Sequence, residues 1–276
     1  MKKRLDVLLV DRGLATGRDR AKALIMRGIV YANDQKAQKS GDEYPEDTFL
    51  EVRGNPLPFV SRGGLKLEKA VKEFNLPVAG AICADIGAST GGFTDCLLSH
   101  GAVKVYAVDV GYGQLAWSLR EDSRVVVLER TNARYLTNSQ IAEPLRLITI
   151  DVSFISLTLL LPALSRLLCE DSHILCLVKP QFEAGKEHVG KKGVVRDPVI
   201  HAHVIEKVAA HAQEIGLIAA DLDFSPIKGP QGNIEYLLHL RNSNAVSDRN
   251  IDAKAVVSRA VKALEEEHEN SHLAEF

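Results

Sequence analysis

Apolar positions in the first 60 residues predict a small unit of two helices followed by short strands. Three leucines within residues 5–9 share one helical face, and Gly13 is placed to end that helix. Residues 17–26 repeat the helical spacing, and Thr16 is the expected N-cap. We expect short strands at residues 29–32 and 49–52, a turn at 33–34 and an extended, proline-containing linker at 54–58.

From residue 61 onward, apolar runs of strand length alternate with segments of helical spacing. Strands are expected at residues 81–86, 103–109, 125–128, 147–152, 174–178, 219–225 and 234–240, and helices at 64–74, 93–100 and 198–216. This alternation is typical of a doubly wound α/β sheet, which binds its ligands at the carboxyl ends of the strands. Residues 249–268 have the spacing of an amphipathic helix and lie in a carboxy-terminal tail.

The composition is that of a globular protein. The chain has 276 residues, of which 46% are hydrophobic and 25% charged, and this length suits one or two domains. The longest mostly apolar stretch, residues 155–164, is much shorter than the roughly 20 residues of a membrane span, and the amino terminus does not resemble a secretion signal. We therefore expect a cytoplasmic protein without a membrane partner, and its oligomeric state stays open.

The cysteines and histidines do not suggest a metal site. The four cysteines form no C-x-x-C pair and lie in apolar stretches, so we expect small buried side chains rather than metal ligands or disulfides. They are Cys83, Cys96, Cys169 and Cys176. His201 and His203 point to different faces of a predicted helix, and we expect both at the surface.

Positive charge is concentrated at the amino terminus, although the net charge of the chain is only −2. The first 39 residues hold ten Lys or Arg against four Asp and no Glu. The tail has the opposite sign, with four glutamates within residues 265–269. A basic module on a near-neutral chain predicts a local contact with a polyanion.

A glycine-rich turn at residues 87–92 follows a predicted strand and precedes a predicted helix, which is the setting of a nucleotide-binding loop. Asp109 ends the next strand, 24 residues after Asp85, where a carboxylate can accept both hydroxyls of a ribose. This arrangement fits a nicotinamide dinucleotide or S-adenosylmethionine. The glycines depart from the order G-x-G-x-x-G, which disfavours the dinucleotide.

Four charged residues lie next to predicted elements of the sheet. Asp151 and Lys179 directly follow strands, Lys66 lies ahead of the sheet, and Glu235 lies at the start of the last strand. An isolated charge at a strand end is usually only solvated. Sheet topology would nevertheless bring Asp151 and Lys179 to the same edge as the glycine-rich turn.

Residues 4–44 resemble the RNA-binding domain first described in ribosomal small-subunit protein S-four. The resemblance rests on Arg4-Leu5-Asp6, Arg12-Gly13-Leu14, the R-x-x-A motif of residues 18–21, and residues 28–33. Gly17 and Asp34 depart mildly from the family pattern, which usually has Ser and Gly there. The resemblance implies RNA binding, for which guanidinium groups are suited because they contact phosphate bidentately. The expected RNA-binding residues are Arg4, Arg12, Arg18, Arg20, Lys22 and Arg27.

The second part resembles the ribose 2′-O-methyltransferases of the FtsJ type, which use S-adenosylmethionine and a Lys-Asp-Lys-Glu tetrad. The motifs SRGGLKL, IDVSFIS, VKPQFE and GNIEYLLHL place this tetrad at Lys66, Asp151, Lys179 and Glu235. The implied cofactor residues are Asp85, Gly87, Ser89, Thr90, Gly91, Gly92 and Phe93 in the loop, Asp109 at the ribose, and Asn132 of RTNARYL near the adenine.

The combination of the two parts is similar to the TlyA family, described as haemolysin-like proteins and as ribosomal RNA 2′-O-methyltransferases that act on cytidines of both subunits. It implies an S-four-type domain with linker over residues 1–60, a methyltransferase domain over 61–242, and a helical or partly disordered tail over 243–276. The implied fold is a Rossmann-like methyltransferase sheet with a small amino-terminal α+β RNA-binding domain. Ribosomal RNA or ribosomal subunits are the implied partner, Lys179 the implied base, and no metal is needed.

Other functions stay open at this point. A membrane-lytic toxin is disfavoured because the chain shows no secretion signal, span or strongly apolar amphipathic segment. A non-catalytic RNA-binding or ribosome-binding protein would have no need of the tetrad, and the glycine order disfavours a nicotinamide-dependent oxidoreductase. Residues 183–193, rich in Gly and Lys, either close over RNA or form a flexible surface loop.

Overall fold

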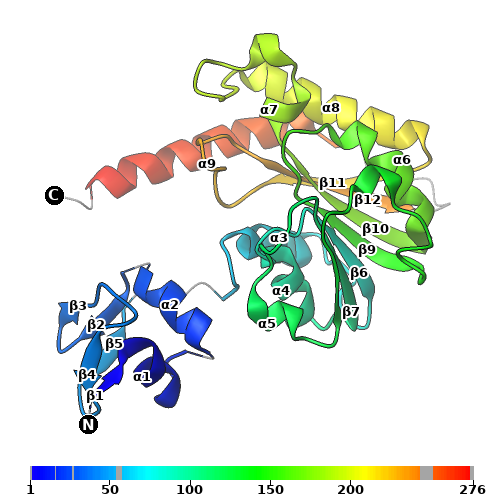
Figure 1. The fold of residues 1–276 in the computed structure, drawn as a ribbon. Coiled ribbons are helices and arrows are strands. Elements are labelled where there is room, and N and C mark those ends of the chain that lie inside the picture. The colour runs from blue at the N-terminus through cyan, green and yellow to red at the C-terminus, as the bar shows by residue number, and fades with distance from the viewer. Residues whose placement is uncertain (1, 16, 27, 54–57, 243–250, 274–276) are drawn as a thin grey trace. The chain divides into compact units, whose positions relative to one another are not determined.

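The computed structural model describes residues 2–15, 17–26, 28–53, 58–242 and 251–273, with side chains up to residue 264. It divides into two compact units, Met1–Val60 and Ser61–Phe276, each described by itself below (Figure 1). The expected N-cap Thr16 and the expected RNA-binding residue Arg27 lie outside the described residues, as does most of the linker.

The first unit packs two helices against short antiparallel strands. Its elements are β1 (Lys2–Arg4), α1 (Leu5–Asp11), α2 (Arg18–Met26), β2 (Val30–Ala32), β3 (Gln35–Lys36), β4 (Glu43–Pro45) and β5 (Leu50–Val52). Strand β1 pairs with β4, and β2 lies between β3 and β5. The turn between β2 and β3 places Asn33 and Asp34 at φ of 45° and 64°, as a tight hairpin turn requires. Leucines of α1 and α2 form its core with Val30.

The second unit is built on a seven-stranded sheet with the order β11-β12-β10-β9-β6-β7-β8. The strands are β6 (Ile82–Ile86), β7 (Lys104–Val108), β8 (Val125–Leu128), β9 (Leu145–Ile150), β10 (Leu168–Val178), β11 (Ile218–Phe224) and β12 (Tyr236–Asn242). All pairings are parallel except those of β12, which is antiparallel to both of its neighbours. The order reverses between β6 and β9, so the predicted doubly wound α/β fold is confirmed.

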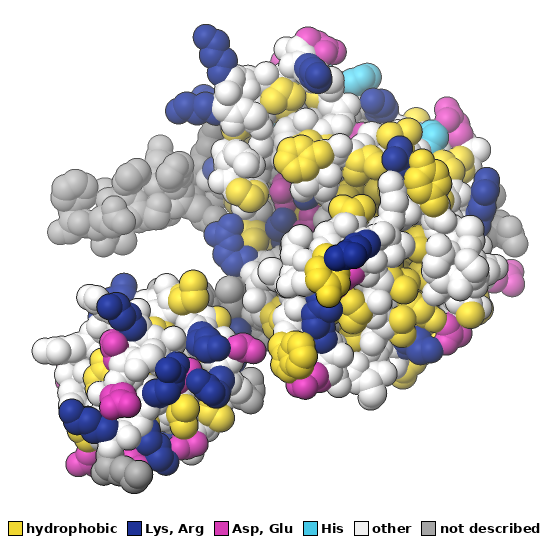
Figure 2. Space-filling view, in the orientation of Figure 1, with side chains coloured by type: hydrophobic (Ala, Val, Ile, Leu, Met, Phe, Trp, Pro, Cys, Tyr) yellow, Lys and Arg dark blue, Asp and Glu magenta, His cyan; other side chains and the backbone are white. Residues whose placement is uncertain are grey.

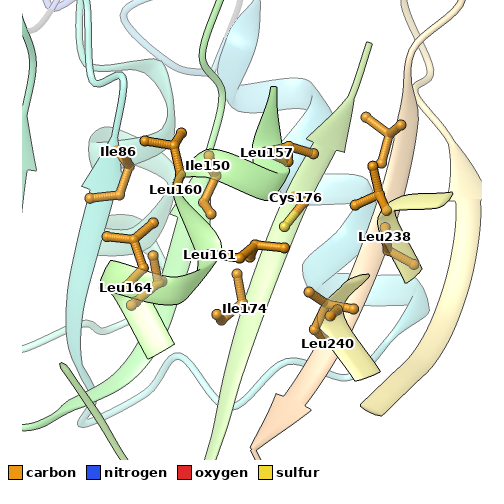
Figure 3. Close-up of a cluster of buried hydrophobic side chains, with 14 of the residues drawn as sticks. Ile86, Ile150, Leu157, Leu160, Leu161, Leu164, Ile174, Cys176, Leu238 and Leu240 are labelled. Carbon is orange, nitrogen blue, oxygen red and sulfur yellow. The ribbon is translucent and has the colours of Figure 1, made fainter. Parts of the chain in front are cut away.

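Helices cover both faces of this sheet (Figure 1). They are α3 (Gly63–Glu73), α4 (Gly92–Ser99), α5 (Trp117–Arg120), α6 (Leu161–Leu164), α7 (Pro180–Glu183), α8 (Pro198–Glu214) and α9 (Ala253–Leu273), with 3₁₀ turns η1 (Ala133–Tyr135), η2 (Leu157–Leu159), η3 (Ser165–Leu167) and η4 (Lys186–His188). On one face, η2, α6, α8 and α9 bury apolar side chains against alternate residues of the strands. Figure 3 shows Ile86, Ile150, Ile174 and Leu238 meeting the leucines of this layer.

Two expectations about the second unit need correction. His201 is buried at 2% exposure on α8 rather than at the surface, because its imidazole bonds the phenol of Tyr236 on the facing strand, whereas His203 is exposed as expected. The carboxy-terminal segment, which we set apart as a tail, contributes Val256 and Ala260 of α9 to the core of this unit. Three of the cysteines are buried, but Cys169 is only half-buried.

Candidate active site

The four predicted tetrad residues come from four elements that meet at one edge of the central sheet. Asp151 directly follows β9 and Lys179 directly follows β10, so both lie at the carboxyl edge of parallel strands. Glu235 directly precedes β12, and because β12 is antiparallel to β10, its amino end lies at this same edge. Lys66 lies in the first turns of α3. The structure therefore brings all four together.

The tetrad forms a chain of alternating charges. Lys179 Nζ lies 2.6 Å from Asp151 Oδ1, and Lys66 Nζ lies 3.6 Å from Asp151 Oδ2 and 2.5 Å from Glu235 Oε2. Both lysines and Glu235 are buried, while the Asp151 side chain is partly exposed. Two positive and two negative charges cancel, which makes it possible to keep four ionised groups away from water.

The glycine-rich turn packs directly against the backbone of the tetrad. Gly87 has φ +84°, and a Cβ at this position would lie 2.4 Å from the carbonyl oxygen of Asp151. A Cβ on Gly92 would lie 2.9 Å from the amide nitrogen of Gly64, two residues before Lys66. Glycine is required at both positions because the chain passes too close for a side chain.

Asp85 fixes the glycine-rich turn by hydrogen bonds to the helix that follows it. It is fully buried, and its Oδ2 accepts hydrogen bonds from the amide and the hydroxyl of Thr94 in the first turn of α4, at 2.9 and 2.7 Å. Burial raises the pKa of Asp85 to about 7, although the bonds from Thr94 favour the charged form. The carboxylate therefore fixes the start of α4 to the end of β6.

The two residues expected at the ribose and the adenine lie on adjacent loops. Asp109 follows β7, and its carboxylate accepts hydrogen bonds from the amides of Ser89 and Gly111, at 2.8 and 2.7 Å. The loop after β8 donates an amide to the carbonyl of Asp109. Asn132 lies in that second loop, where its Oδ1 accepts from the amide of Arg134 and caps η1.

A cavity of about 480 Å³ lies between the glycine-rich turn and the tetrad, a size typical of small-molecule sites. All four tetrad residues line it, together with Asp85, Gly87, Ser89, Thr90, Gly92 and Phe93 of the predicted cofactor loop. Gly91, Asp109 and Asn132 are absent from the lining as far as the described residues go. Ala88 also lines it and lies within the predicted turn, although it was not singled out. Sequence reasoning missed the other lining residues, which are Ser61, Arg62, Gly63, Ser153, Ile227, Lys228, Gly229 and Pro230.

The loop of residues 227–230 is one part of the cavity lining that the sequence did not predict. Gly229 leaves room for the tetrad, because a Cβ there would lie 2.7 Å from Glu235 Oε1. The chain carries this loop to the site only because β11 and β12 pair as a hairpin at the end of the sheet. The glycines and proline around it indicated a turn but gave no sign of its position.

An exposed aromatic side chain stands beside the tetrad and was also missed. Phe154 is 91% exposed, and its φ of 65° is uncommon for a bulky residue. Its ring lies 5.0 Å from that of Phe182, which in turn lies 5.9 Å from Lys179 Nζ. Glu183 stabilises the loop that carries Phe154 by accepting from Ser156 Oγ at 2.6 Å. An aromatic residue in the loop that follows Asp151 was the available signal.

In the first unit, two of the predicted RNA-binding arginines share a buried partner. Arg4 and Arg18 both donate to Asp6, which is fully buried, with nitrogen–oxygen distances of 3.0 Å. The hydrogen bond from Arg4 is the largest cause that lowers the pKa of Asp6 to about 2. The arginine side chains remain 46% and 56% exposed, so part of each guanidinium group still faces solvent.

The other predicted RNA-binding residues of this unit also have partners within it. Arg12 donates to two backbone carbonyls within residues 46–48, and Arg20 donates to a backbone carbonyl near the end of the unit. Lys22 pairs at 3.3 Å with an aspartate three residues before it. Their side chains therefore have a structural role besides any contact with RNA.

The second unit provides features that suit S-adenosylmethionine binding: a glycine-rich turn, a buried acid that bonds the helix after it, and an acid at the next strand end. Within the described ranges, no group of three or more His, Cys, Asp or Glu side chains could bind a metal ion. No helix of the described chain combines the length and the apolar character needed to cross a membrane.

Comparison with known proteins agrees with this geometry. Residues 59–242 match the model of the family described as FtsJ-like methyltransferase. The chain is 58% identical over 240 residues to "Putative rRNA methyltransferase YqxC" of Bacillus subtilis, covering 87% of this chain and 85% of that protein. It is 48% identical over 264 residues to "16S/23S rRNA (cytidine-2'-O)-methyltransferase TlyA" of Mycobacterium tuberculosis, covering 95% and 97%.

A solved structure is also similar over nearly the whole chain. This is "Putative hemolysin from Streptococcus thermophilus", with a TM-score of 0.77 and 46% identity over 97% of this chain and 98% of that one. Names that refer to haemolysis and names that refer to RNA methylation therefore occur among proteins similar to this chain.

Proposed function

The chain belongs to the family of FtsJ-like methyltransferases, and from this premise we propose that it methylates the ribose 2′-oxygen of cytidines in ribosomal RNA. The methyl donor is S-adenosylmethionine. The Mycobacterium tuberculosis relative named for this reaction matches 95% of the chain. The protein acts in the cytoplasm, and its RNA is recognised within ribosomal subunits or as free ribosomal RNA.

The observation that carries this proposal is the buried chain of Lys179, Asp151, Lys66 and Glu235 on the wall of the cavity. A ribose hydroxyl is a poor nucleophile at neutral pH, so a group must accept its proton as the new bond forms. A pure RNA-binding surface would not require four ionised side chains to be buried in one place, because burying them is costly.

Lys179 is the residue we assign to proton transfer. Lys179 first gives its own proton to solvent, so that Nζ can act as an acceptor. As the ribose oxygen bonds to the methyl carbon and the bond from that carbon to sulfur breaks, the hydroxyl proton moves to Lys179 Nζ and the sulfur keeps the bonding electron pair. Asp151 fixes Lys179 through the 2.6 Å contact and holds Lys66 on its other oxygen. Glu235 fixes Lys66, so the four groups stay aligned for in-line approach of the hydroxyl.

The cofactor supplies a methyl group bonded to a positively charged sulfur. Gly87 and Gly92 let the turn that would hold it pack against the segments of Asp151 and Gly64, since neither position has room for a side chain. Asp109 lies at the edge where a ribose is held in nucleotide-binding folds of this type. A cofactor held by these residues would present its methyl group in the cavity that the glycine-rich turn and the tetrad both line.

We assign RNA binding to the first unit, with Arg4 and Arg18 contacting phosphate through the exposed half of their side chains. The bonds to Asp6 orient both guanidinium groups, and an oriented guanidinium loses less entropy when it binds. The excess of basic residues in this part of the chain supports this assignment.

Transfer of a labelled methyl group from S-adenosylmethionine to undermodified ribosomal subunits tests the proposal. We expect label on the 2′-oxygen of a cytidine, loss of transfer in Lys179→Ala, and unchanged cofactor binding in that variant. Cofactor binding without label on either subunit would refute the proposed reaction, and label on a base would refute the role of the tetrad.

A further inference from the structure

A second basic surface lies on the second unit, in residues 185–197 between α7 and α8, which we call the strap. Its exposed cations are Lys186, Lys191, Lys192 and Arg196. Within the described part of the chain, no carboxylate pairs with any of them. The two acids of the strap have other contacts: Glu187 lies 3.8 Å from His188, and Asp197 caps α8 by accepting from the amide of Val199 at 2.9 Å.

Hydrogen bonds from buried polar side chains fix the strap to the rest of the second unit, which distinguishes it from a flexible surface loop. Val195 is buried, and its amide donates to Asn233 Oδ1 at 3.1 Å. Asn233 Nδ2 donates to the carbonyl of Gly193 at 2.9 Å. His201 Nε2 lies 2.9 Å from the carbonyl of Val195, which can only accept, so Nε2 carries the proton and Nδ1 accepts from the hydroxyl of Tyr236 at 2.7 Å.

These bonds tie the strap to both sides of a tetrad residue. Asn233 and Tyr236 flank Glu235 in the chain, and the other end of the strap follows α7, which begins directly after Lys179. The strap therefore has a fixed position at the same edge of the sheet as the cavity. Figure 2 shows dark-blue side chains at the top of the second unit, in the region where Figure 1 draws α7 and the loop that follows it.

A tight turn presents two of the cations at the tip of the strap. The amide of Gly190 donates to the carbonyl of Val194 at 3.1 Å, and the amide of Gly193 donates to the carbonyl of Gly190 at 2.8 Å. Lys191 and Lys192 occupy the positions between these glycines and are exposed. Adjacent unpaired ammonium groups repel each other, and a polyanion relieves that repulsion.

We propose that the strap binds the phosphates of the RNA chain next to the methylated nucleotide, with Asn233 and His201 as positioning residues that fix its distance from Glu235. This inference rests on the proposed function and assigns a second RNA contact to the catalytic unit itself. The first unit then supplies affinity for the RNA, while the strap sets which ribose reaches the tetrad.

The test compares Lys191→Ala/Lys192→Ala with Arg166→Ala in the full-length protein. Arg166 is an exposed cation in η3, which leads into the amino end of β10, at the edge of the sheet opposite the tetrad. Ribosomal RNA from cells lacking this protein serves as the probe. Filter binding over a salt series gives the Kd, calorimetry gives cofactor affinity, and methyl transfer gives kcat and KM.

We expect the strap variant to raise the Kd for RNA roughly tenfold and to reduce the slope of log Kd against log salt by about 0.7 for each lost phosphate contact. Cofactor affinity stays unchanged, and Arg166→Ala behaves as the wild type. An unchanged slope would overturn the proposal. Unchanged binding of free RNA with weaker binding of whole subunits would also overturn it, and would assign the strap to a ribosomal protein.

A second variant separates position from charge. Asn233→Ala keeps every cation but removes both side-chain bonds to the strap, so we expect kcat to fall much more than KM rises. Asn233→Asp keeps the acceptor for Val195 and should restore part of kcat. Equal loss of RNA binding in Asn233→Ala and the lysine variant would overturn the positioning role. The two proposals can fail separately. If the wild-type protein transfers no methyl group but the lysine variant still binds RNA more weakly, the RNA contact of the strap is supported and the proposed reaction is refuted.

Discussion

The charge balance of the tetrad makes a quantitative prediction about Asp151→Asn. Asp151 is the carboxylate shared by both lysines, at 2.6 Å from Lys179 Nζ and 3.6 Å from Lys66 Nζ. At an effective dielectric constant of about 20, the shorter contact represents roughly 6 kcal/mol and the longer one roughly 5 kcal/mol of gross attraction, before the cost of desolvation is subtracted. The substitution keeps the shape of the side chain but leaves two ammonium groups with one carboxylate.

Removing one partner of a buried ion pair costs about 3–5 kcal/mol, because the remaining charge is left uncompensated. The Asp151 side chain is partly exposed, so we expect about 3 kcal/mol of lost unfolding free energy, near the low end. Methyl transfer should fall by a factor of about a thousand or more, since the group that orients the base is gone.

The double variant Asp151→Asn/Lys179→Met separates stability from chemistry. It removes one charge of each sign, and the pair of Lys66 and Glu235 at 2.5 Å remains balanced. We expect it to regain at least about half of the lost unfolding free energy while remaining inactive. Such a result would show that the single variant is destabilised by its uncompensated charge.

Urea unfolding measures both effects. Trp117 is the only tryptophan of the chain and lies in the second unit, so its fluorescence follows the unit that holds the tetrad. Wild-type stability in Asp151→Asn would refute the argument from charge balance. A double variant no more stable than the single one would refute it as well, and transfer by either variant would refute the role of Asp151.

Three further predictions follow from other contacts. Gly87→Ala should weaken cofactor binding more than tenfold, because its Cβ would meet the Asp151 carbonyl at 2.4 Å. The control Gly80→Ala has a similar φ of +72° but lies in open space, so it should lose only about 1–2 kcal/mol of stability to backbone strain and bind the cofactor normally. Equal calorimetric affinities of the two variants would contradict this. The pKa of Asp6 is lowered to about 2 from its unfolded value of 3.8, so the group contributes about 2 kcal/mol of stability above pH 3.8, which is lost as the pH falls from 3.8 to about 2. Hydrogen exchange of the first unit should show this loss, and Asp6→Asn should abolish the pH dependence. Burial lowers the pKa of His173 to about 4 from 6.5, so the second unit should lose up to a few kcal/mol of unfolding free energy as the pH falls from 6.5 to about 4. Urea unfolding at a series of pH values should show this loss, and an equally steep pH dependence in His173→Leu would count against it.

Much of the fold was accessible from local pattern alone. The strand at residues 125–128 has the predicted bounds, and α3, β6 and α4 begin within one residue of the predicted positions. These segments are bounded by glycine or polar residues, so local signals define them. The first strand and the strands at residues 35–36 and 43–45 were missed, because two or three residues cannot establish a period.

Part of the site was accessible in the same way. Carboxyl ends of parallel strands meet at one edge, so the pattern around Asp151 and Lys179 was enough to predict that they lie near the glycine-rich turn. Lys66 and Glu235 were noted near the ends of predicted elements, but only the resemblance to a family assigned them to the site. Nothing local shows that the last strand runs antiparallel, and this reversal is what brings Glu235 to within 2.5 Å of Lys66.

By itself, the sequence determined the elements, the class of fold and the residues whose type suits methyl transfer, because each of these depends on neighbours a few positions apart. Only the tertiary structure decided which side chains are paired, buried or fixed. His201 on α8 is buried because Tyr236 of a distant strand lies against it, and the strap is held by Asn233, 38 residues beyond Val195. Burial and hydrogen bonding of this kind arise from packing between segments far apart in the chain, and a local pattern of apolar and polar residues contains no information about such packing.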